Sequence, residues 1–194
     1  DQWKTWVTLL RKSKAFAFDT ETTSKHAMQA SLVGMSFSVE GKACYVPLKH
    51  HYLDVPDQLD MAVVLQDLQP IFDNPKILKI GQNIKYDLQV LVQKGCVPKA
   101  PFFDTMLASY VLESGLTRHN LDDLAKRHLN IETTHFDEVV GKGAKQKTFD
   151  EVDVDTATHY AAEDADVTFK LYQHFSKHFE SEPELKQLFE EEEM

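Results

Sequence analysis

Two acidic residues stand side by side at the end of a short apolar run near the start of the chain. Asp19 and Glu21 follow residues 15–18 and are two positions apart. Residues with this spacing on a strand point to the same face of a sheet. Carboxylates held this close repel each other unless a cation lies between them. The pair therefore indicates either a cation-binding strand end or a solvated strand terminus.

A third acid, Asp87, follows the apolar segment 77–80 and a short polar loop. Its surroundings predict the first turn of a helix, where the helix dipole favours an acidic side chain. Asp87 is therefore either a stabilising partner of that helix or, together with the other acids, a metal ligand.

Tyr160 and Asp164 are four residues apart in a segment of helical character, so they share one face of the helix. Small alanines around them would let this helix pack closely against a sheet, which would bring Asp164 towards Asp19 and Glu21. Glu163 and Asp166 are expected on other sides of the helix, in contact with solvent.

The chemistry that suits such a set of groups is phosphodiester hydrolysis. Two divalent ions can provide a water of lowered pKa and neutralise charge on the departing oxygen. Mg²⁺ prefers hard oxygen ligands and keeps several waters, so a few carboxylates suffice to hold it. Four acids without a histidine or cysteine cluster match this preference and argue against a dedicated zinc site.

The order of these residues resembles that of the DEDD exonucleases, in their tyrosine-bearing branch. Further strings resemble the Klenow-type proofreading 3′→5′ exonuclease domain of bacterial DNA polymerase I, over nearly the whole chain. These strings are residues 16–22, 81–87, 103–110, 141–143 and 160–166. The resemblance implies a single domain over residues 1–194 and an α/β, ribonuclease-H-like fold with a mixed central β-sheet flanked by helices. It also places the C-terminal end near the junction with a polymerase domain.

By this resemblance, Asp19 bridges two divalent cations, Mg²⁺ by preference, with Mn²⁺ also supporting activity. Glu21 and Asp164 complete the site of the water-activating ion, and Asp87 holds the second ion. Tyr160 orients the attacking water. An unperturbed phenol titrates near pH ~10, so the tyrosine is not expected to act as the base.

Substrate contacts are also implied by the resemblance. Phe136 is either a platform for a terminal base or an ordinary core aromatic. Lys25 stands where the family often has an apolar residue, so it contacts a phosphate instead, or Met28 takes over the apolar role. Asn83 is expected at the substrate, and Arg118 is either a DNA-backbone contact or a surface arginine.

Two further groups carry weaker signals. Lys142, Lys145 and Lys147 form a small basic loop, which is either solvated or in contact with phosphates. The neighbouring histidines His50 and His51 are expected at the surface and not as ligands.

Alternating patterns predict the elements that position these residues. A three-stranded meander precedes alternating helices and strands, which favours a mixed sheet. Asn120 and Ser181 are expected helix caps. The predicted strands are 15–18, 32–39, 43–48, 77–80 and 102–103, and the predicted helices are 57–72, 85–94, 105–112, 120–129, 156–179 and 181–193.

Composition limits the partners. The net charge of the 194 residues is −10, whereas a stand-alone nucleic-acid binder normally has a basic face. Bound cations or a neighbouring domain would reconcile this charge with a DNA substrate. No apolar run approaches the ~20 residues that span a bilayer, and no signal peptide is visible. Cys44 and Cys96 are expected as free thiols, typical of a cytosolic protein, and the resemblance implies bacterial cytoplasm.

The resulting prediction is a 3′→5′ exonuclease that acts on single-stranded DNA ends, beside a polymerase domain of the same polypeptide, as a monomer. Three alternatives remain. An RNA 3′-trimming enzyme of the RNase D type would use the same acids, because they do not contact the sugar. A silent structural module of a polymerase would have lost its acids. A metal-free nucleotide-binding cleft would suffer repulsion between the acids and phosphate.

Overall fold

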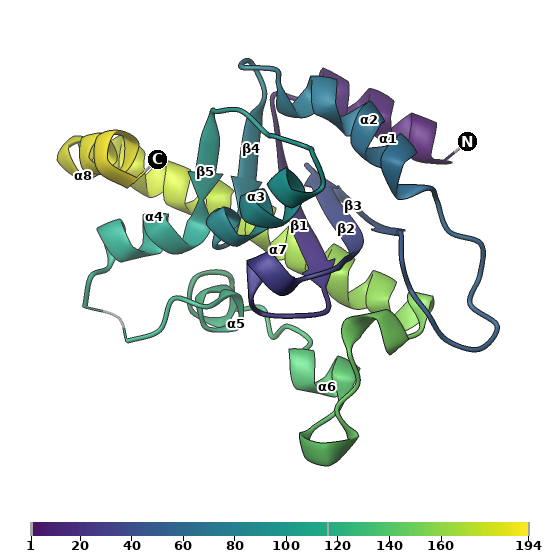
Figure 1. The fold of residues 1–194 in the computed structure, drawn as a ribbon. Coiled ribbons are helices and arrows are strands. Elements are labelled where there is room, and N and C mark those ends of the chain that lie inside the picture. The colour runs from purple at the N-terminus through teal and green to yellow at the C-terminus, as the bar shows by residue number, and fades with distance from the viewer. Residues whose placement is uncertain (1, 116, 194) are drawn as a thin grey trace.

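The computed structural model describes residues 2–115 and 117–193. Within these residues, one mixed five-stranded sheet has the order β3–β2–β1–β4–β5 (Figure 1). β1, β2 and β3 are antiparallel neighbours, whereas β4 runs parallel to β1 and β5 parallel to β4. The strands are β1 Ala15–Thr22, β2 Leu32–Val39, β3 Lys42–Pro47, β4 Leu78–Gly81 and β5 Phe102–Asp104. The predicted meander and α/β architecture are confirmed.

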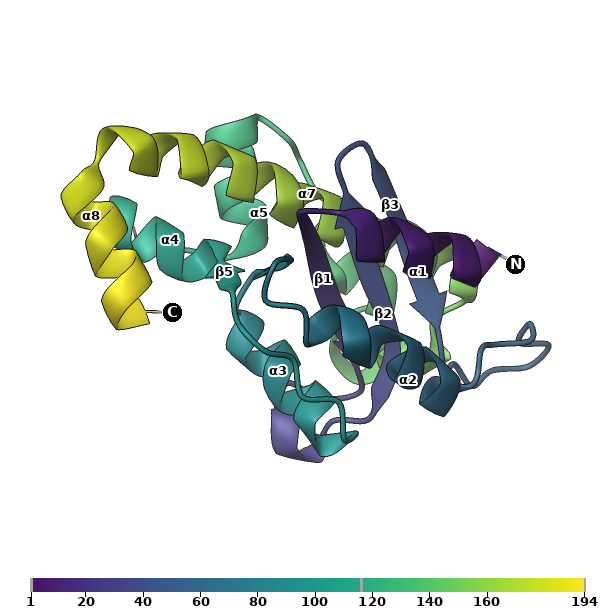
Figure 2. The ribbon, with the colours of Figure 1, turned by 90° about the horizontal axis from the view of Figure 1, so that it is seen from above.

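Helices cover both faces of this sheet. In Figure 2, α2 and α3 lie on one side of the strands and α7 lies on the other. The α-helices are α1 Gln2–Lys12, α2 Met61–Phe72, α3 Ile84–Gln93, α4 Thr105–Leu112, α5 Leu121–Leu124, α6 Phe136–Val140, α7 Val154–Ser181 and α8 Pro183–Leu188. Short 3₁₀ turns span Ala27–Gln29, Gly143–Lys145 and Phe149–Glu151, and π-helical turns span Ala125–Leu129 and Phe189–Glu193. No helix among the described residues is long and apolar enough to cross a membrane.

The pleat of β1 decides which side of the sheet its acids face. Phe16 and Phe18 pack on Phe72 of α2, with ring centroids 5.9 and 5.1 Å apart. Ala17 between them belongs to the opposite core, which contains residues of α7. Alternate residues share a face, so Asp19 and Glu21 follow Ala17 towards α7.

A stripe of small residues brings α7 close to the sheet. Ala157, Ala161 and Ala165 are fully buried and four residues apart, so they lie along one side of the helix. The helix contacts β1, β2, β3 and β4. Asp164 lies beside this stripe, so close packing of the alanines sets its distance from β1.

Several helix boundaries in the structure differ from those that the sequence predicts. α1 was not predicted, and α2 begins at Met61 because the Asp60 side chain accepts hydrogen bonds from the amides of Ala62 and Val63. The prediction of Ser181 as a cap is wrong, since α7 continues through it and Glu182 precedes α8. Asn120 is confirmed as the cap of α5 through the amide of Asp123.

The expectation that His50 lies at the surface is also wrong. Its ring is buried, with Nε2 2.7 Å from the Tyr45 hydroxyl and Nδ1 2.9 Å from the carbonyl oxygen of Val152. The segment after β3 contacts the segment before α7, where the His51 amide donates to the Asp150 carbonyl. Val152 and Asp150 are about a hundred residues away from His50 and His51. The local sequence therefore does not show that His50 is buried. His51 itself is exposed, as expected.

Gly34 in β2 is required by this arrangement. A Cβ atom added to Gly34 would lie 2.0 Å from the Tyr45 hydroxyl oxygen, which His50 holds in place. We expect Gly34→Ala to destabilise the fold by about 1–3 kcal/mol through overpacking. The melting temperature should fall by roughly 2–12 °C in a thermal melt.

Gly115→Ala is the matched control, because no atom of the described residues, apart from its chain neighbours, lies within 4 Å of the Cβ position at Gly115. Equal melting temperatures for the two variants would mean that the Tyr45 side chain can move away from residue 34 without destabilising the fold.

Candidate active site

Five side chains from three elements meet at the end of β1. Asp19 and Glu21 come from the strand, Tyr160 and Asp164 from α7, and Asp87 from the first turn of α3. The charges of the other three acids act on Glu21, and Tyr160 forms a side-chain hydrogen bond with Asp164. The structure thus brings together all five residues for which the sequence predicted catalysis.

Burial of these acids makes their ionised forms unfavourable. It raises the pKa of Asp19 to about 6, against the opposing effect of a hydrogen bond from the Thr20 backbone. Burial also holds the pKa of Glu21 well above its usual range, and the negative charges of Asp19, Asp164 and Asp87 add to this effect. The pKa values of Asp87 and Asp164 are raised by burial and by Asp19. The cluster therefore favours protons or other positive charge.

One oxygen of the cluster has no hydrogen-bond partner among the described residues. Glu21 Oε1 is buried and lacks any hydrogen bond from the described residues. A buried acceptor without a donor is unfavourable, and a cation would satisfy it. The available donor atoms are carboxylate oxygens, which fit Mg²⁺ or Mn²⁺.

The acids are not preassembled around one point. Within residues 2–115 and 117–193, no three histidine, cysteine or carboxylate groups already stand at metal-binding distances from one another. Asp87 Oδ1 accepts hydrogen bonds from the Thr20 amide at 2.9 Å and from the Thr20 hydroxyl at 2.5 Å. Ion binding therefore has to compete with existing contacts and draw the side chains closer together.

Thr20 is a positioning residue that the sequence analysis missed. It lies between two acids on β1, so its side chain points to the opposite face, towards α3. Both of its hydrogen bonds fix the carboxylate of Asp87, which reaches the strand end from that side. The alternation of β1 was the signal that could have identified Thr20.

Asp104 is a second positioning residue that was missed. Its carboxylate accepts hydrogen bonds from the amides of Asn83, Ile84 and Met106, at 3.0, 2.9 and 2.9 Å. These bonds join the starts of α3 and α4 and hold Asn83 in a left-handed conformation, with φ of 58°. An acid directly before a predicted helix is a capping signal that could have drawn attention to Asp104.

The phenol of Tyr160 stays protonated in this setting. Burial raises the pKa of Tyr160, and the charge of Asp164 raises it further. Its ring packs against both Phe136 and Phe149, with centroid distances of 6.1 and 6.0 Å. A fixed, neutral hydroxyl beside the acids can orient a water molecule, but it is a poor base at neutral pH.

A hollow of about 680 Å³ opens beside the acids. Lys25, Asn83 and Phe136, three of the residues with predicted substrate contacts, line it, and so does Lys147 from the basic loop. Phe136 is half-buried and stacks on Phe149 at 6.4 Å, so it is both a packed aromatic and part of the wall. Met28 is 75% exposed and is not among the lining residues.

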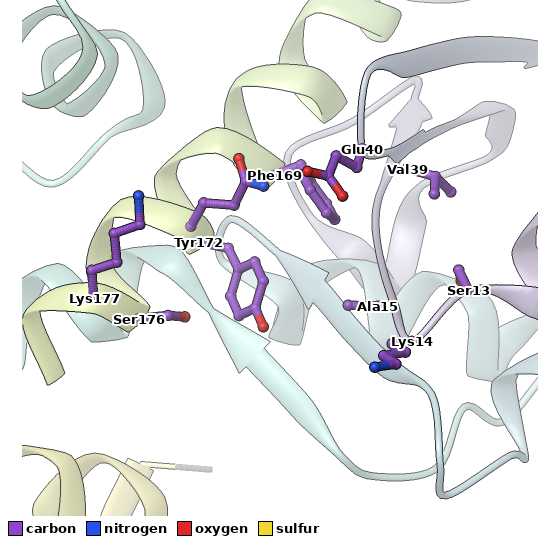
Figure 3. A pocket seen from close by; sticks show the side chains of 10 residues that line it. Ser13, Lys14, Ala15, Val39, Glu40, Phe169, Tyr172, Ser176 and Lys177 are labelled. Atoms are coloured by element: carbon purple, nitrogen blue, oxygen red, sulfur yellow. The ribbon is translucent and has the colours of Figure 1, made fainter. Parts of the chain in front are cut away.

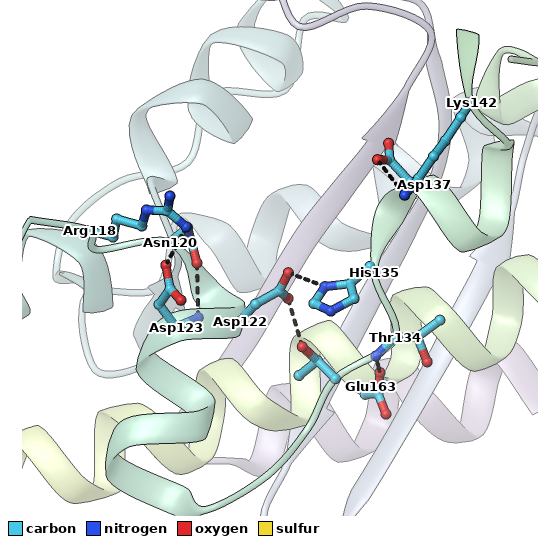
Figure 4. Close-up of polar contacts among 10 residues, drawn as sticks. Arg118, Asn120, Asp122, Asp123, Thr134, His135, Asp137, Lys142 and Glu163 are labelled. Carbon is cyan, nitrogen blue, oxygen red and sulfur yellow. Dashed lines mark hydrogen bonds and ion pairs between the residues drawn. The ribbon is translucent and has the colours of Figure 1, made fainter.

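Arg118, the fourth predicted contact, does not line this hollow. It is exposed, and its guanidinium lies 3.9 Å from a carboxylate oxygen of Asp123 (Figure 4). Lys142 is similarly exposed and lies 3.7 Å from Asp137. The Arg118 and Lys142 side chains can therefore contact only a substrate that extends beyond the hollow.

The segment before α6 is tied to its neighbours by polar contacts (Figure 4). Asp122 accepts a hydrogen bond from the Thr133 hydroxyl and lies 2.8 Å from His135 Nδ1. The Thr134 amide donates to a carboxylate oxygen of Glu163 at 2.7 Å, so this half-buried acid, expected on a solvent-facing side of α7, also holds the segment before α6. These contacts fix the position from which Phe136 enters the wall of the hollow.

A separate hollow of about 560 Å³ lies at the other end of β1 (Figure 3). Ala15 of β1 and Glu40 of the turn between β2 and β3 border it on one side, and Tyr172 and Lys177 border it from α7. None of the five clustered residues is part of its lining.

Sequence comparisons match the chain to one part of bacterial DNA polymerase I. It is 47% identical over 192 residues to DNA polymerase I of Pseudomonas aeruginosa, and 40% identical over 186 residues to DNA polymerase I of Rhizobium leguminosarum. The matches cover 97% and 86% of this chain. It spans only 21% and 18% of the length of these relatives.

Solved structures show the same fold at low identity. Pol1 of M. smegmatis, solved with a DNA primer-template and dNTP, has a TM-score of 0.71 at 16% identity, over 96% of this chain and 28% of that one. Brucella melitensis NrnC with bound Mg²⁺ has a TM-score of 0.64 at 21% identity, over 91% and 79%. Escherichia coli RNase D has a TM-score of 0.70 at 15% identity, over 93% and 44%. These neighbours confirm the ribonuclease-H-like architecture.

A family model described as 3′-5′ exonuclease matches residues 1–180. The match includes both acids of β1, Asp87 of α3 and the pair on α7. This chain belongs to the 3′-5′ exonuclease family.

Proposed function

We propose that the chain hydrolyses single-stranded DNA from the 3′ end with the help of divalent cations, releasing nucleoside monophosphates. The observation that carries this proposal is the meeting of four acids and Tyr160 at one strand end, where no described residue donates to Glu21 Oε1. Its membership of the 3′-5′ exonuclease family gives the reaction class.

Two divalent cations are the cofactors that this donor set would hold. Asp19, Glu21 and Asp164 would bind one, and Asp19 with Asp87 would bind the other. Bound there, the ions would supply a water of lowered pKa and neutralise charge on the departing oxygen. Support comes from the buried oxygen donors of the cleft and from Mg²⁺ in the structure of NrnC.

The chain's own side chains would orient the reactants. The Tyr160 hydroxyl, fixed by Asp164 and by its aromatic neighbours, would hold the attacking water in line. Phe136 would support a terminal base on the wall of the hollow, and Lys25 and Lys147 would contact phosphates there. Asn83 would contribute its side chain at the mouth of the hollow, and Arg118 would contact the DNA backbone farther along the strand.

DNA is the proposed substrate because the curated relatives named above are DNA polymerases. The fold is shared with RNase D, so it does not decide between deoxyribose and ribose, and this preference has to be measured. The chain spans about one fifth of these relatives, and we propose that a polymerase domain accompanies it in one cytoplasmic, monomeric polypeptide. Such a domain would also offset the net charge of −10 when DNA binds.

The direct test is digestion of matched 5′-labelled single-stranded DNA and RNA, with Mg²⁺, Mn²⁺ or EDTA. We expect a ladder shortened from the 3′ end of DNA that disappears in EDTA. Asp19→Ala should reduce the rate by more than about 100-fold, because it removes a proposed metal ligand.

Asp155→Ala is the matched control for this test, since Asp155 is an exposed acid in the first turn of α7. Its rate should equal that of the wild type. Faster digestion of RNA would overturn the DNA assignment, and cutting that survives EDTA or Asp19→Ala would overturn the metal-dependent mechanism.

Tyr160→Phe tests the role of the hydroxyl separately. The ring contacts with Phe136 and Phe149 remain in this variant, so the wall of the hollow should keep its shape. We expect a loss of roughly 10–100-fold, about the value of one hydrogen bond to a charged group. Single-turnover rates at saturating Mn²⁺ measure it, and a loss as large as that of Asp19→Ala would contradict a purely orienting role.

The raised pKa values predict how the ion-free protein responds to pH. The unfolded chain loses its carboxyl protons near pH ~4, whereas folded Asp19 holds its proton up to about pH 6. Stability in EDTA should therefore fall as the pH rises from 5 to 8. In Asp19→Asn the fall should be shallower and the melting temperature at pH 8 higher by several degrees, since 1 kcal/mol corresponds to roughly 2–4 °C.

Thermal melts with and without Mn²⁺ complete this measurement. Mn²⁺ should raise the wild-type melting temperature more at pH 8 than at pH 5, because protons compete with the ion at low pH. Asp155→Asn should follow the wild type throughout. A melting temperature in EDTA that rises from pH 5 to 8 would show that the acids are not under mutual repulsion.

A further inference from the structure

The fold assembles a cluster of histidines that are distant in the sequence. His174 and His178 lie one turn apart on α7, with ring centroids 4.6 Å apart. His128, in the π-helical turn Ala125–Leu129, has its ring centroid 4.9 Å from that of His174. Glu113 at the end of α4 places a carboxylate oxygen 3.0 Å from His128 Nε2.

Three polar atoms in this cluster are buried, and two of them, on His128 and Glu113, face each other. The side chain of His128 is only 7% exposed. His128 Nε2, His174 Nε2 and Glu113 Oε2 all lack a hydrogen bond within the described part of the chain. His128 Nε2 and Glu113 Oε2 form a close nitrogen–oxygen contact of 3.0 Å. By the usual bond lengths, a nitrogen and an oxygen that bind one tetrahedral zinc ion lie roughly 3.4 Å apart, so only a small separation of the two groups would admit an ion.

We propose that His128, His174, His178 and Glu113 bind a transition-metal ion such as Zn²⁺, at a site separate from the acids of β1. Zinc–nitrogen bonds of about 2.0–2.1 Å put the ring centroids of two histidines on one tetrahedral ion roughly 5 Å apart. The observed separations of 4.9 and 4.6 Å are close to this value.

Binding requires a local adjustment. No three ligand groups among the described residues already stand at metal-binding distances. His178 is exposed, so its ring can turn towards His174 without displacing core side chains. His174 Nε2 is buried without a hydrogen bond from the described residues, so this nitrogen is free to bind an ion.

The chemistry of this cluster differs from that of the acid cleft. Imidazole nitrogens select Zn²⁺, Co²⁺ or Ni²⁺ over Mg²⁺, whereas carboxylates alone suit Mg²⁺ or Mn²⁺. Tyr172, Ser176 and Lys177 of α7 face the hollow at the start of β1 (Figure 3), and neither His174 nor His178 is among its lining residues. The two histidines therefore occupy another side of the helix. An ion there would join α4, the turn 125–129 and α7.

Titration with Co²⁺, followed by visible absorption, tests the proposal. A tetrahedral, histidine-rich site gives strong d–d bands, whereas oxygen ligation in the acid cleft gives faint ones. We expect one strongly absorbing ion per chain in the wild type and also in Asp19→Asn. His174→Gln should lower the Co²⁺ affinity at least tenfold, and Zn²⁺ should displace Co²⁺ competitively.

His159→Gln is the matched control, because His159 is an exposed histidine on the same helix. It should bind Co²⁺ like the wild type, and His174→Gln should keep the wild-type melting temperature in EDTA. Glu113→Gln provides a second variant should His174→Gln fail to fold, and it should also weaken binding. Absence of the bands in the wild type, equal affinity in the variants, or loss of the bands in Asp19→Asn would overturn the proposal.

Discussion

Repulsion among four enclosed carboxylates is the constraint on which the rest of the architecture depends. Burial and the neighbouring charges raise the pKa values of Asp19, Glu21, Asp87 and Asp164, so the ion-free cluster opposes its own ionisation. The acids remain together because rigid elements on both faces of the sheet hold them. Repulsion between the ionised carboxylates lowers the folding stability, and a bound divalent cation relieves it. The larger this loss of stability is, the more strongly the cleft attracts divalent cations.

Each acid is held in a different way. The pleat of β1 turns Asp19 and Glu21 to one face, and the buried alanines of α7 bring Asp164 against that face. Asp87 approaches from the other face and is fixed by Thr20. Since these supports come from separate elements, the geometry of the cleft depends on the packing of the whole domain, not on one loop.

Much of this arrangement could be predicted from local patterns. The strands and the five clustered residues followed from alternation, helix spacing and motif resemblance. His50 could not be placed, because its burial depends on Val152 about a hundred residues away. The histidine cluster was missed for the same reason, since it joins His128 to His174 only after α7 has packed. Contacts between distant segments leave no periodic signal in a single sequence.

The alternation of β1 also limits how this chain can change its length. Removing one residue between Ala15 and Asp19 would reverse the face of every later side chain on the strand. The two acids would then point towards α2 and α3, and Thr20 would take their place beside α7. Such a deletion would invert the site while leaving the composition of the strand almost unchanged. A one-residue insertion or deletion in the first strand is therefore incompatible with this site.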